Sequence, residues 1–231
     1  METEIVKKKV VIGLPGNNFS SKFLVSWTSS LNTLWEMNKY DIIVSPGVSS
    51  YVSFARMQTL GLSNLRGIEQ KAFDGMHFDV FVTIDSDIVF TAQNLIDLIE
   101  ATEEQDVVAG YYRMSDLKNL VVVKDWDINH FKKAGSFKYL QNDDMEEYKN
   151  EKYLKVAYCG MGFMALTKKA IDSLSYPYFH TDLQEFKGTD GKLIREMCSE
   201  DVSFCRNLTK EGFEINILPN LRVGHEKAII I

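Results

Sequence analysis

Disulfide and metal-binding cysteine patterns are missing from this sequence of 231 residues. It has only three cysteines, none of them in a C-x-x-C spacing: Cys159, Cys198 and Cys205. An odd number of unclustered cysteines favours reduced, buried thiols over a disulfide framework or a zinc site. We therefore expect a cytoplasmic protein.

Long hydrophobic runs are missing as well. The apolar stretch that follows Lys7 to Lys9 ends at Pro15 and Gly16, which is too short for a secretion signal. No later stretch reaches the ~18 apolar residues of a membrane span. The sequence predicts no transmembrane segment.

A surplus of positive charge is also absent, since 26 Lys and Arg residues stand against 32 Asp and Glu residues, for a net charge of -6. Nucleic-acid-binding domains carry a basic patch or stripe, so the composition argues against a nucleic-acid partner. No internal repeat, low-complexity tract or linker divides the chain, which favours one domain over residues 1–231.

The first half alternates strand and helix patterns. Apolar runs suited to strands occur at 10–14, 40–44, 78–84 and 106–110, and helices are predicted at 23–35, at 49–60 and after a cap at Thr91. The run at 78–84 is apolar at nearly every position, as in strands that are covered on both faces. This order predicts an α/β fold with an open, mostly parallel sheet flanked by helices.

The first helix illustrates the pattern. Phe23, Trp27, Leu31 and Trp35 recur every four residues, which predicts one buried helix face, with Ser20 or Ser21 as the cap.

The second half is less regular. Residues 126–152 are polar and charged, 153–159 return to strand character, and 176–197 are rich in loop residues and aromatics. Ser199 is predicted to cap a helix that ends near Gly212, followed by a strand at 213–217.

The most informative stretch is Asp85-Ser86-Asp87, which follows the third predicted strand. Open α/β sheets bind ligands at the carboxyl ends of their strands, and Mg²⁺ or Mn²⁺ often links one or two carboxylates to substrate phosphates. The alternative is a turn in which the two carboxylates cap backbone amides. A second D-x-D, Asp125-Trp126-Asp127, lies farther from any predicted strand end.

Three motifs together resemble those of GT-A fold nucleotide-sugar glycosyltransferases, in the order of that family and across nearly the whole chain. Asp85-Ser86-Asp87 resembles the D-x-D motif, Ser199-Glu200-Asp201 resembles the x-E-D motif, and His225 stands where the family often has a C-terminal histidine. Cys159-Gly160-Met161-Gly162-Phe163 also resembles the glycine-bearing strand end that lines the sugar site. The resemblance implies a Rossmann-like GT-A sheet with an irregular acceptor-side second half, divided into a nucleotide-sugar-binding half (1–115) and an acceptor-side half (116–231).

The resemblance also implies roles for individual residues. The implied metal ligands for Mn²⁺ or Mg²⁺ are Asp85, Asp87 and His225. The implied nucleotide-sugar-binding residues are Pro15, Gly16, Arg56, Asp85, Ser86, Gly160 and Gly162, with Arg56 resembling an Ala-Arg element whose next residue, Met57, departs from the usual polar one. The implied catalytic base is Asp201, with Glu200 as the second choice.

The reaction implied is transfer of a sugar from a nucleoside-diphosphate sugar to a hydroxyl of a glycan or other acceptor, by a hexosyl- or deoxyhexosyltransferase in glycan biosynthesis. Each motif also has a simpler explanation: acids favour the first turn of any helix, glycines punctuate strand ends, and a lone histidine is often a surface residue. Tyr176, Tyr178 and Phe179 are aromatics of the kind that stack on acceptor sugars, although packing in the core is the commoner role.

Two other functions fit parts of the pattern. Asp85-Ser86-Asp87-Ile88-Val89 also matches the motif of haloacid-dehalogenase-like phosphatases, with Asp85 as nucleophile, although that motif normally follows a first strand. A non-catalytic nucleotide-sugar-binding or carbohydrate-binding module is the other possibility. The apolar end 228–231 suggests self-association, a docked terminal strand, or one module of a longer protein.

Overall fold

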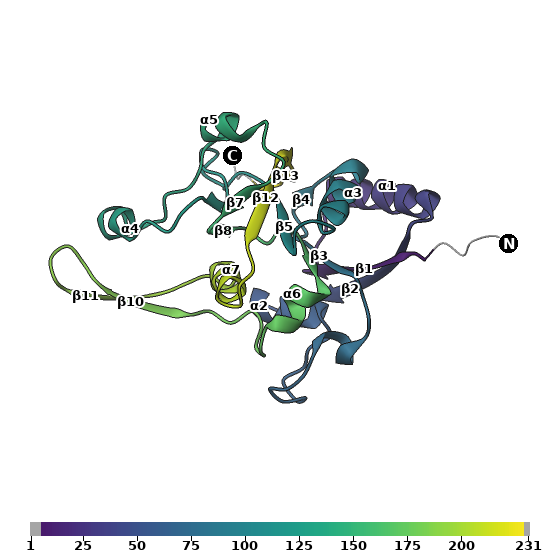
Figure 1. Cartoon of the computed structure of the whole chain (residues 1–231), viewed down its shortest axis with the longest axis horizontal. Helices are drawn as coiled ribbons and strands as arrows, with labels where there is room; N and C mark the ends of the chain where they lie inside the picture. The colour runs from purple at the N-terminus through teal and green to yellow at the C-terminus, as the bar shows by residue number, and fades with distance from the viewer. Residues whose placement is uncertain (1–5, 229–231) are drawn as a thin grey trace.

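The computed structural model describes residues 6–228, so positions 229–231 of the apolar end 228–231 lie outside the described residues. Its centre is a seven-stranded sheet (Figure 1). In spatial order the strands are β2 (Tyr40–Gly47), β1 (Lys8–Pro15), β3 (Val80–Ile84), β9 (Phe163–Thr167), β5 (Val107–Tyr111), β12 (Ile215–Arg222) and β7 (Leu154–Val156).

Five of these strands run in one direction, because β2, β1 and β3 pair in parallel and β5 pairs in parallel with β12. Strands β9 and β7 run the other way. The mostly parallel α/β sheet predicted from the sequence is therefore confirmed. Since β9 comes from the second half of the chain and lies between β3 and β5, the two halves share one sheet.

Both faces of the sheet are buried, as the apolar run at 78–84 predicts. Val80, Val82 and Ile84 of β3 pack on one face beneath α1 (Ser21–Met37) and α3 (Ala92–Ala101). Phe81 packs on the other face. The helices on that face are α2 (Val52–Thr59), α6 (Lys168–Ser173) and α7 (Glu200–Lys210).

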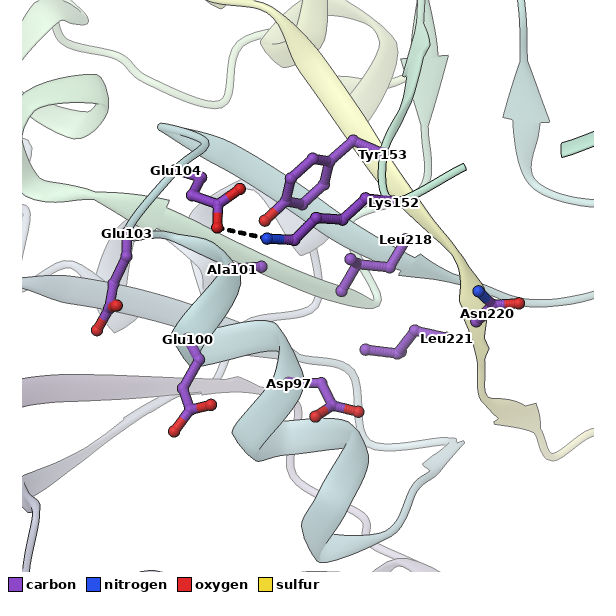
Figure 2. Close-up of a pocket in the computed structure, with 10 residues that line it drawn as sticks. All are labelled: Asp97, Glu100, Ala101, Glu103, Glu104, Lys152, Tyr153, Leu218, Asn220 and Leu221. Carbon is purple, nitrogen blue, oxygen red and sulfur yellow. Dashed lines mark hydrogen bonds and ion pairs between the residues drawn. The ribbon is translucent and has the colours of Figure 1, made fainter. Parts of the chain in front are cut away.

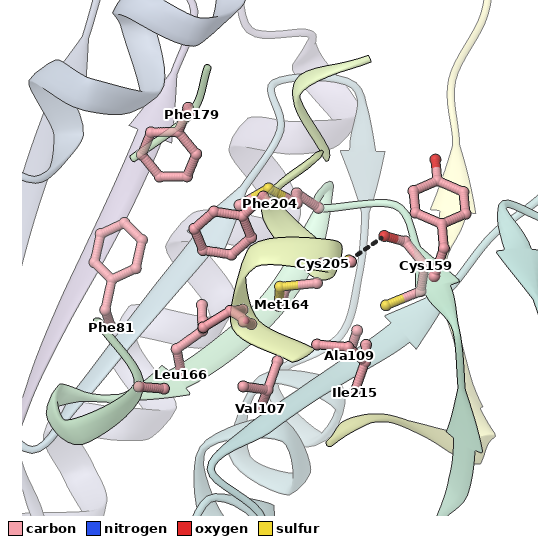
Figure 3. Close-up of a cluster of buried hydrophobic side chains, with 14 of the residues drawn as sticks. Phe81, Val107, Ala109, Cys159, Met164, Leu166, Phe179, Phe204, Cys205 and Ile215 are labelled. Carbon is pink, nitrogen blue, oxygen red and sulfur yellow. Dashed lines mark hydrogen bonds between the residues drawn. The ribbon is translucent and has the colours of Figure 1, made fainter. Parts of the chain in front are cut away.

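The core under α7 is dense and apolar (Figure 3). Phe204 of α7 stacks on Phe179 with ring centroids 4.9 Å apart, and the Sγ of Cys205 lies 3.6 Å from the carbonyl oxygen of Cys159. The three cysteines are free and buried, as predicted. Tyr178 and Phe179 are also buried, so these two aromatics pack in the core.

Helix α1 begins as predicted but buries a different stripe. The side chain of Ser20 accepts a hydrogen bond from the amide of Phe23. Toward the end of the helix Leu34 is fully buried and Trp35 is 59% exposed. Each residue turns by about 100° around the helix axis, so each step of four drifts by about 40°, and three such steps leave the buried face.

Shorter elements complete the chain. They are β4 (Ile88–Val89), β6 (Val122–Val123), β8 (Tyr158–Cys159), β10 (Leu183–Lys187), β11 (Leu193–Met197), β13 (Gly224–His225), α4 (Ile128–Ala134), α5 (Asn142–Met145), η1 (Ala72–Gly75) and η2 (Glu146–Tyr148). The predicted strand at 153–159 is two strands, because β7 pairs with β12 and β8 pairs with β6.

The loop-rich interpretation of 176–197 is wrong for its second part. Strands β10 and β11 form an antiparallel hairpin, closed by a hydrogen bond from the Gly188 amide to the Lys192 carbonyl. Its side chains are largely exposed, so it lacks the apolar pattern by which strands are recognised. Within residues 6–228, no helix is long and apolar enough to cross a membrane.

Candidate functional site

Arg56 joins the two acidic motifs. This buried side chain of α2 places Nη1 2.9 Å from Oδ1 of Asp85 and Nη2 3.1 Å from Oδ2. Its Nε lies 3.4 Å from Oε1 of Glu200, and Nη1 also donates to the hydroxyl of Thr83 at 3.3 Å. Burial acts to lower the pKa of Arg56, but the charges of Asp85 and Glu200 outweigh it and raise the pKa, so the guanidinium is always charged.

The turn that carries Asp85 is fixed by its backbone. The Asp85 amide donates to the carbonyl of Gly162 at 2.9 Å, and the Asp85 carbonyl accepts from the amide of Ile88 at 3.1 Å. Gly16, at the end of β1, has φ +130, and a Cβ there would lie 3.1 Å from Oγ of Ser86. The ends of β1 and β3 therefore meet, which brings the predicted nucleotide-binding residues Pro15 and Gly16 beside the D-x-D turn.

Asp87 faces the C-terminal segment. The short strand β13 pairs with β4, which brings Nε2 of His225 to 3.3 Å from Oδ2 of Asp87. The Nζ of Lys227 lies 2.6 Å from the same oxygen. Burial raises the pKa of Asp87, but hydrogen bonds and charges from His225 and Lys227 outweigh it and lower the pKa to about 2.

The tautomer of His225 follows from its second contact. Its Nδ1 lies 2.7 Å from the carbonyl oxygen of Arg113, which only accepts hydrogen bonds, so Nδ1 carries a proton. A neutral His225 then presents the lone pair of Nε2 toward a carboxylate oxygen of Asp87. In this structure the ammonium of Lys227, 2.6 Å from the same oxygen, supplies the positive charge at these two groups.

This pair fits a divalent ion. A carboxylate and an imidazole whose other nitrogen is held by a carbonyl are an ordinary ligand pair, and Mg²⁺ or Mn²⁺ commonly takes only one or two protein ligands together with substrate phosphates. Asp85, the third predicted ligand, turns both oxygens toward Arg56. Among residues 6–228, no three His, Cys, Asp or Glu side chains are grouped closely enough to hold an ion by themselves.

Gly160 and Gly162 lie in the loop between β8 and β9, where Tyr112 fills the space beside them. A Cβ would lie 2.4 Å from the Tyr112 hydroxyl oxygen at Gly160 and 2.6 Å from it at Gly162. This hydroxyl accepts a hydrogen bond from the Gly162 amide at 3.0 Å, and the ring packs edge-on against His225 at 4.8 Å. The glycines therefore let Tyr112 support both the Asp85 turn and His225.

Glu200 and Asp201 begin α7 and differ in their surroundings. Burial and repulsion from Asp201 raise the pKa of Glu200, although Arg56 opposes this. Asp201 accepts from the hydroxyl of Tyr158 at 2.8 Å and from the amide of Val202 at 2.9 Å. The hydroxyl of Ser199 also donates to Asp201, so Ser199 acts on a neighbouring carboxylate and makes no side-chain cap of its own.

The structure thus brings the predicted residues into two adjoining groups. Asp85, Arg56 and Glu200 form one, and Asp87 with His225 forms the other. Sequence reasoning missed three contacting residues: Tyr112, Tyr158 and Lys227. Lys227 is two residues beyond His225, and Tyr112 directly follows β5, so position near a motif or strand end is the only sequence signal for them.

The second D-x-D has a structural role. The side chain of Asp127 caps α4 by accepting from the amide of His130 at 2.8 Å, while Asp125 is exposed. Elsewhere, a cavity of about 420 Å³ lies between α3 and β12, lined by Glu100, Glu104, Lys152 and Tyr153 among others (Figure 2). None of the predicted site residues lines it.

No protein-family model and no curated protein matches this sequence. A structure of GalNAc-T7 with UDP, GalNAc and Mn²⁺ superposes with a TM-score of 0.50 at 12% identity, covering 97% of this chain and 44% of that one. The chain has the GT-A fold. At this identity the likeness shows the fold alone.

Two further solved structures are similar at lower scores. Protein A197 from STIV has a TM-score of 0.48 at 15% identity, covering 97% of this chain and 96% of its own. A Drosophila β1,4-galactosyltransferase 7 variant in complex with manganese, UDP-Gal and xylobiose has a TM-score of 0.46 at 10% identity, covering 96% of this chain and 71% of its own.

Proposed function

We propose that the protein is a metal-dependent glycosyltransferase, which moves a hexosyl or deoxyhexosyl group from a nucleoside-diphosphate sugar to a hydroxyl of a glycan or other acceptor. The observation that carries the proposal is the contact of Arg56 with both Asp85 and Glu200. This contact brings the Asp85-Ser86-Asp87 turn beside the acid-bearing start of α7 in a GT-A fold, which supports the proposal.

On the donor side, Asp87 and His225 would hold the divalent ion, which supplies positive charge to the departing diphosphate as a Lewis acid. Arg56 contacts both oxygens of Asp85, which leaves Asp87 and His225 as the protein ligands in this proposal. The ends of β1 and β3, with Gly16 against Ser86, form the edge assigned to the nucleotide.

On the acceptor side, Asp201 is the better candidate for the base. Glu200 is occupied by Arg56, and its side chain is only 14% exposed. Asp201 is half-buried, and its hydrogen bond from Tyr158 holds the carboxylate in one orientation. A carboxylate within hydrogen-bond reach of the attacking hydroxyl accepts its proton and contributes about 10²- to 10⁴-fold in rate.

The phosphatase alternative has less support. Arg56 contacts both oxygens of Asp85 at 2.9 and 3.1 Å and stabilises its negative charge, which makes Asp85 a weaker nucleophile. Asp85 also follows β3, the third strand of the chain, which lies between β1 and β9, whereas the phosphatase motif normally follows a first strand.

The test is a turnover assay with a panel of nucleoside-diphosphate sugars, with and without Mn²⁺, in which released nucleoside diphosphate is measured. We expect metal-dependent release with one donor. We further expect its loss in Asp87→Asn and its retention in Asp125→Asn, the matched control in the second D-x-D. Release of phosphate from a phosphate ester in reactions without a sugar donor would favour the phosphatase. Donor binding without turnover would favour the binding module.

A further inference from the structure

An aromatic pocket borders α7 through Arg206. It has a volume of about 250 Å³ and lies between α4 and the β10–β11 hairpin. Figure 1 shows these two elements at the same end of the molecule, away from the N-terminus. Its aromatic lining residues are Trp126, Phe131, Phe137 and Phe186. The other lining residues are Ile128, Gln184, Arg206 and Asp127, whose side chain caps α4.

The aromatic walls are packed edge to face. Phe131 contacts Phe186 of the hairpin with ring centroids 5.4 Å apart, and Trp126 contacts Phe137 at 5.3 Å. Trp126 nevertheless remains 42% exposed. The exposed part of this indole is a surface on which a ligand can stack.

The pocket is connected to the proposed base by one residue. The ring of Tyr158 is stacked with Trp126 at 6.4 Å and 27°, and its hydroxyl donates to Asp201 at 2.8 Å. A ligand on Trp126 is therefore a neighbour of the reacting centre, separated from it by Tyr158.

The polar groups at the pocket have hydrogen-bonding capacity to spare. The Nη1 of Arg206 points to Sγ of Cys198 at 3.6 Å, which uses one of the five donors of a guanidinium. The amide nitrogen of Gln184 also contacts that sulfur, so its carbonyl oxygen is left as an acceptor. Aromatic walls with a few polar groups are typical of small-molecule sites.

We propose that this pocket binds a sugar ring of the acceptor, the ring adjacent to the one that carries the reacting hydroxyl. A pyranose offers an apolar face of C–H groups for Trp126 and hydroxyls at its rim for Gln184 and Arg206. The volume lies below the range of about 300–1,000 Å³ usual for drug-sized ligands, so it suits one ring and is too small for a nucleotide sugar. This assignment of an acceptor rests on the proposed transferase function.

Binding can be measured without donor or metal. We would label the full chain with 5-fluorotryptophan and record its fluorine spectrum during titration with methyl glycosides of glucose, galactose, mannose and N-acetylglucosamine. The three resonances belong to Trp27, Trp35 and Trp126, so two serve as internal controls. We expect only the Trp126 resonance to shift with at least one glycoside.

Variants complete the test. Phe186→Ala should raise the glycoside dissociation constant obtained from this titration about tenfold or more. Leu193, an exposed hairpin residue, lies outside the pocket, so Leu193→Ala should leave the dissociation constant unchanged. In turnover assays with an oligosaccharide acceptor, Trp126→Ala should raise the acceptor KM about tenfold and leave kcat and the donor KM unchanged.

The outcomes separate this assignment from the transferase proposal. If glycosides shift the Trp126 resonance but no sugar transfer occurs, the transferase proposal is overturned and the pocket remains a sugar-binding site. Transfer with no Trp126 shift, or with Leu193→Ala as harmful as Trp126→Ala, overturns the pocket assignment. A Trp126 resonance that responds to hexanol and benzyl alcohol and to none of the glycosides overturns it as well, and assigns the pocket to an apolar aglycone.

Discussion

The ammonium nitrogen of Lys227 lies 2.6 Å from Oδ2 of Asp87. This oxygen also faces Nε2 of His225, so a residue of the chain holds a positive charge where the proposed divalent ion would bind. The lysine and the ion would compete for one carboxylate oxygen.

Removal of this competing charge should strengthen metal binding. A single and a double positive charge about 4 Å apart in a largely aqueous environment repel by about 2 kcal/mol, so we expect Lys227→Ala to bind Mn²⁺ roughly thirtyfold more tightly. The measurement is free Mn²⁺ by electron paramagnetic resonance, without donor. Lys22→Ala is the control, because Lys22 pairs with the neighbouring Glu226 at 3.5 Å and does not touch Asp87. Weaker binding in Lys227→Ala would show that the lysine supports the ion.

Loss of Arg56 should damage stability far more than loss of a surface arginine. Arg56→Ala leaves the largely buried carboxylates of Asp85 and Glu200 without their cation, and breaking a buried pair in this way costs about 3–5 kcal/mol. Arg195→Ala removes an exposed pair with Glu185 on the hairpin and should cost at most about 1 kcal/mol. Urea unfolding of both variants measures the difference. Equal losses would contradict the central position given to Arg56.

Titration of Glu200 and titration of Glu103 should change the unfolding free energy in opposite directions as pH rises. The pKa of Glu200 is raised in the folded protein, by burial first and then by Asp201, so the folded state binds its proton more tightly than the unfolded state does. Unfolding free energy should therefore fall as pH rises from the ordinary value of 4.5 through the higher folded value. Glu200→Gln removes this fall.

Glu103 provides the control of opposite sign. A hydrogen bond and the charge of Lys8 lower the pKa of Glu103, so its contribution is present above pH 4.5 and is lost as pH falls through the lower folded value. Urea unfolding should be measured between pH 3 and 7. As pH rises, the unfolding free energy of Glu200→Gln should increase relative to that of the parent protein, and that of Glu103→Gln should decrease relative to it. The same sign for both would contradict the environment assigned to Glu200.

Gly162 should tolerate no side chain while Tyr112 is in place. The Cβ of Gly162→Ala would overlap the Tyr112 hydroxyl oxygen at 2.6 Å, and overpacking of this kind costs about 1–3 kcal/mol. Because Tyr112 packs on His225, the variant should also weaken Mn²⁺ binding. Adding Tyr112→Phe should recover part of the stability, since it removes the overlapping oxygen. No recovery in the double variant would show that Tyr112 is not the obstructing group.

The proposed base makes a prediction that separates catalysis from binding. Asp201→Asn should lower the transfer rate about 10²- to 10⁴-fold, whereas thermal stabilisation by donor and Mn²⁺ should persist. Glu200→Gln should keep a larger share of the rate. If Glu200→Gln abolished transfer and Asp201→Asn did not, the roles of these two acids would be exchanged.

The sheet was predictable because its strands are buried on both faces and leave long apolar runs, as at 78–84. The buried stripe of α1 was misplaced because steps of four drift off a helix face, which exposes Trp35 and buries Leu34. The β10–β11 hairpin was missed because neither of its faces is buried. A local apolar pattern in the sequence indicates which side chains are buried. The buried face of α1 and the exposed hairpin do not follow such a pattern.

The motifs were found because they follow strand ends or open a helix. Their contacts were harder to predict, since Arg56 meets Asp85 and Glu200 across 29 and 144 positions of the sequence. Lys227 reaches Asp87 across 140 positions. Such pairs depend on the folded backbone, and no spacing in the sequence encodes them.

The most direct test of the account is the interdependence of metal and diphosphate at Asp87. Thermal unfolding should be measured with Mn²⁺ alone, with each nucleoside-diphosphate sugar alone, and with both, in the parent protein and in Asp87→Asn. We expect one donor to stabilise the parent protein strongly only when Mn²⁺ is present, and neither ligand to stabilise Asp87→Asn in this way. Equal stabilisation of the two proteins, or none of the parent protein by any donor with Mn²⁺, would contradict the proposed site.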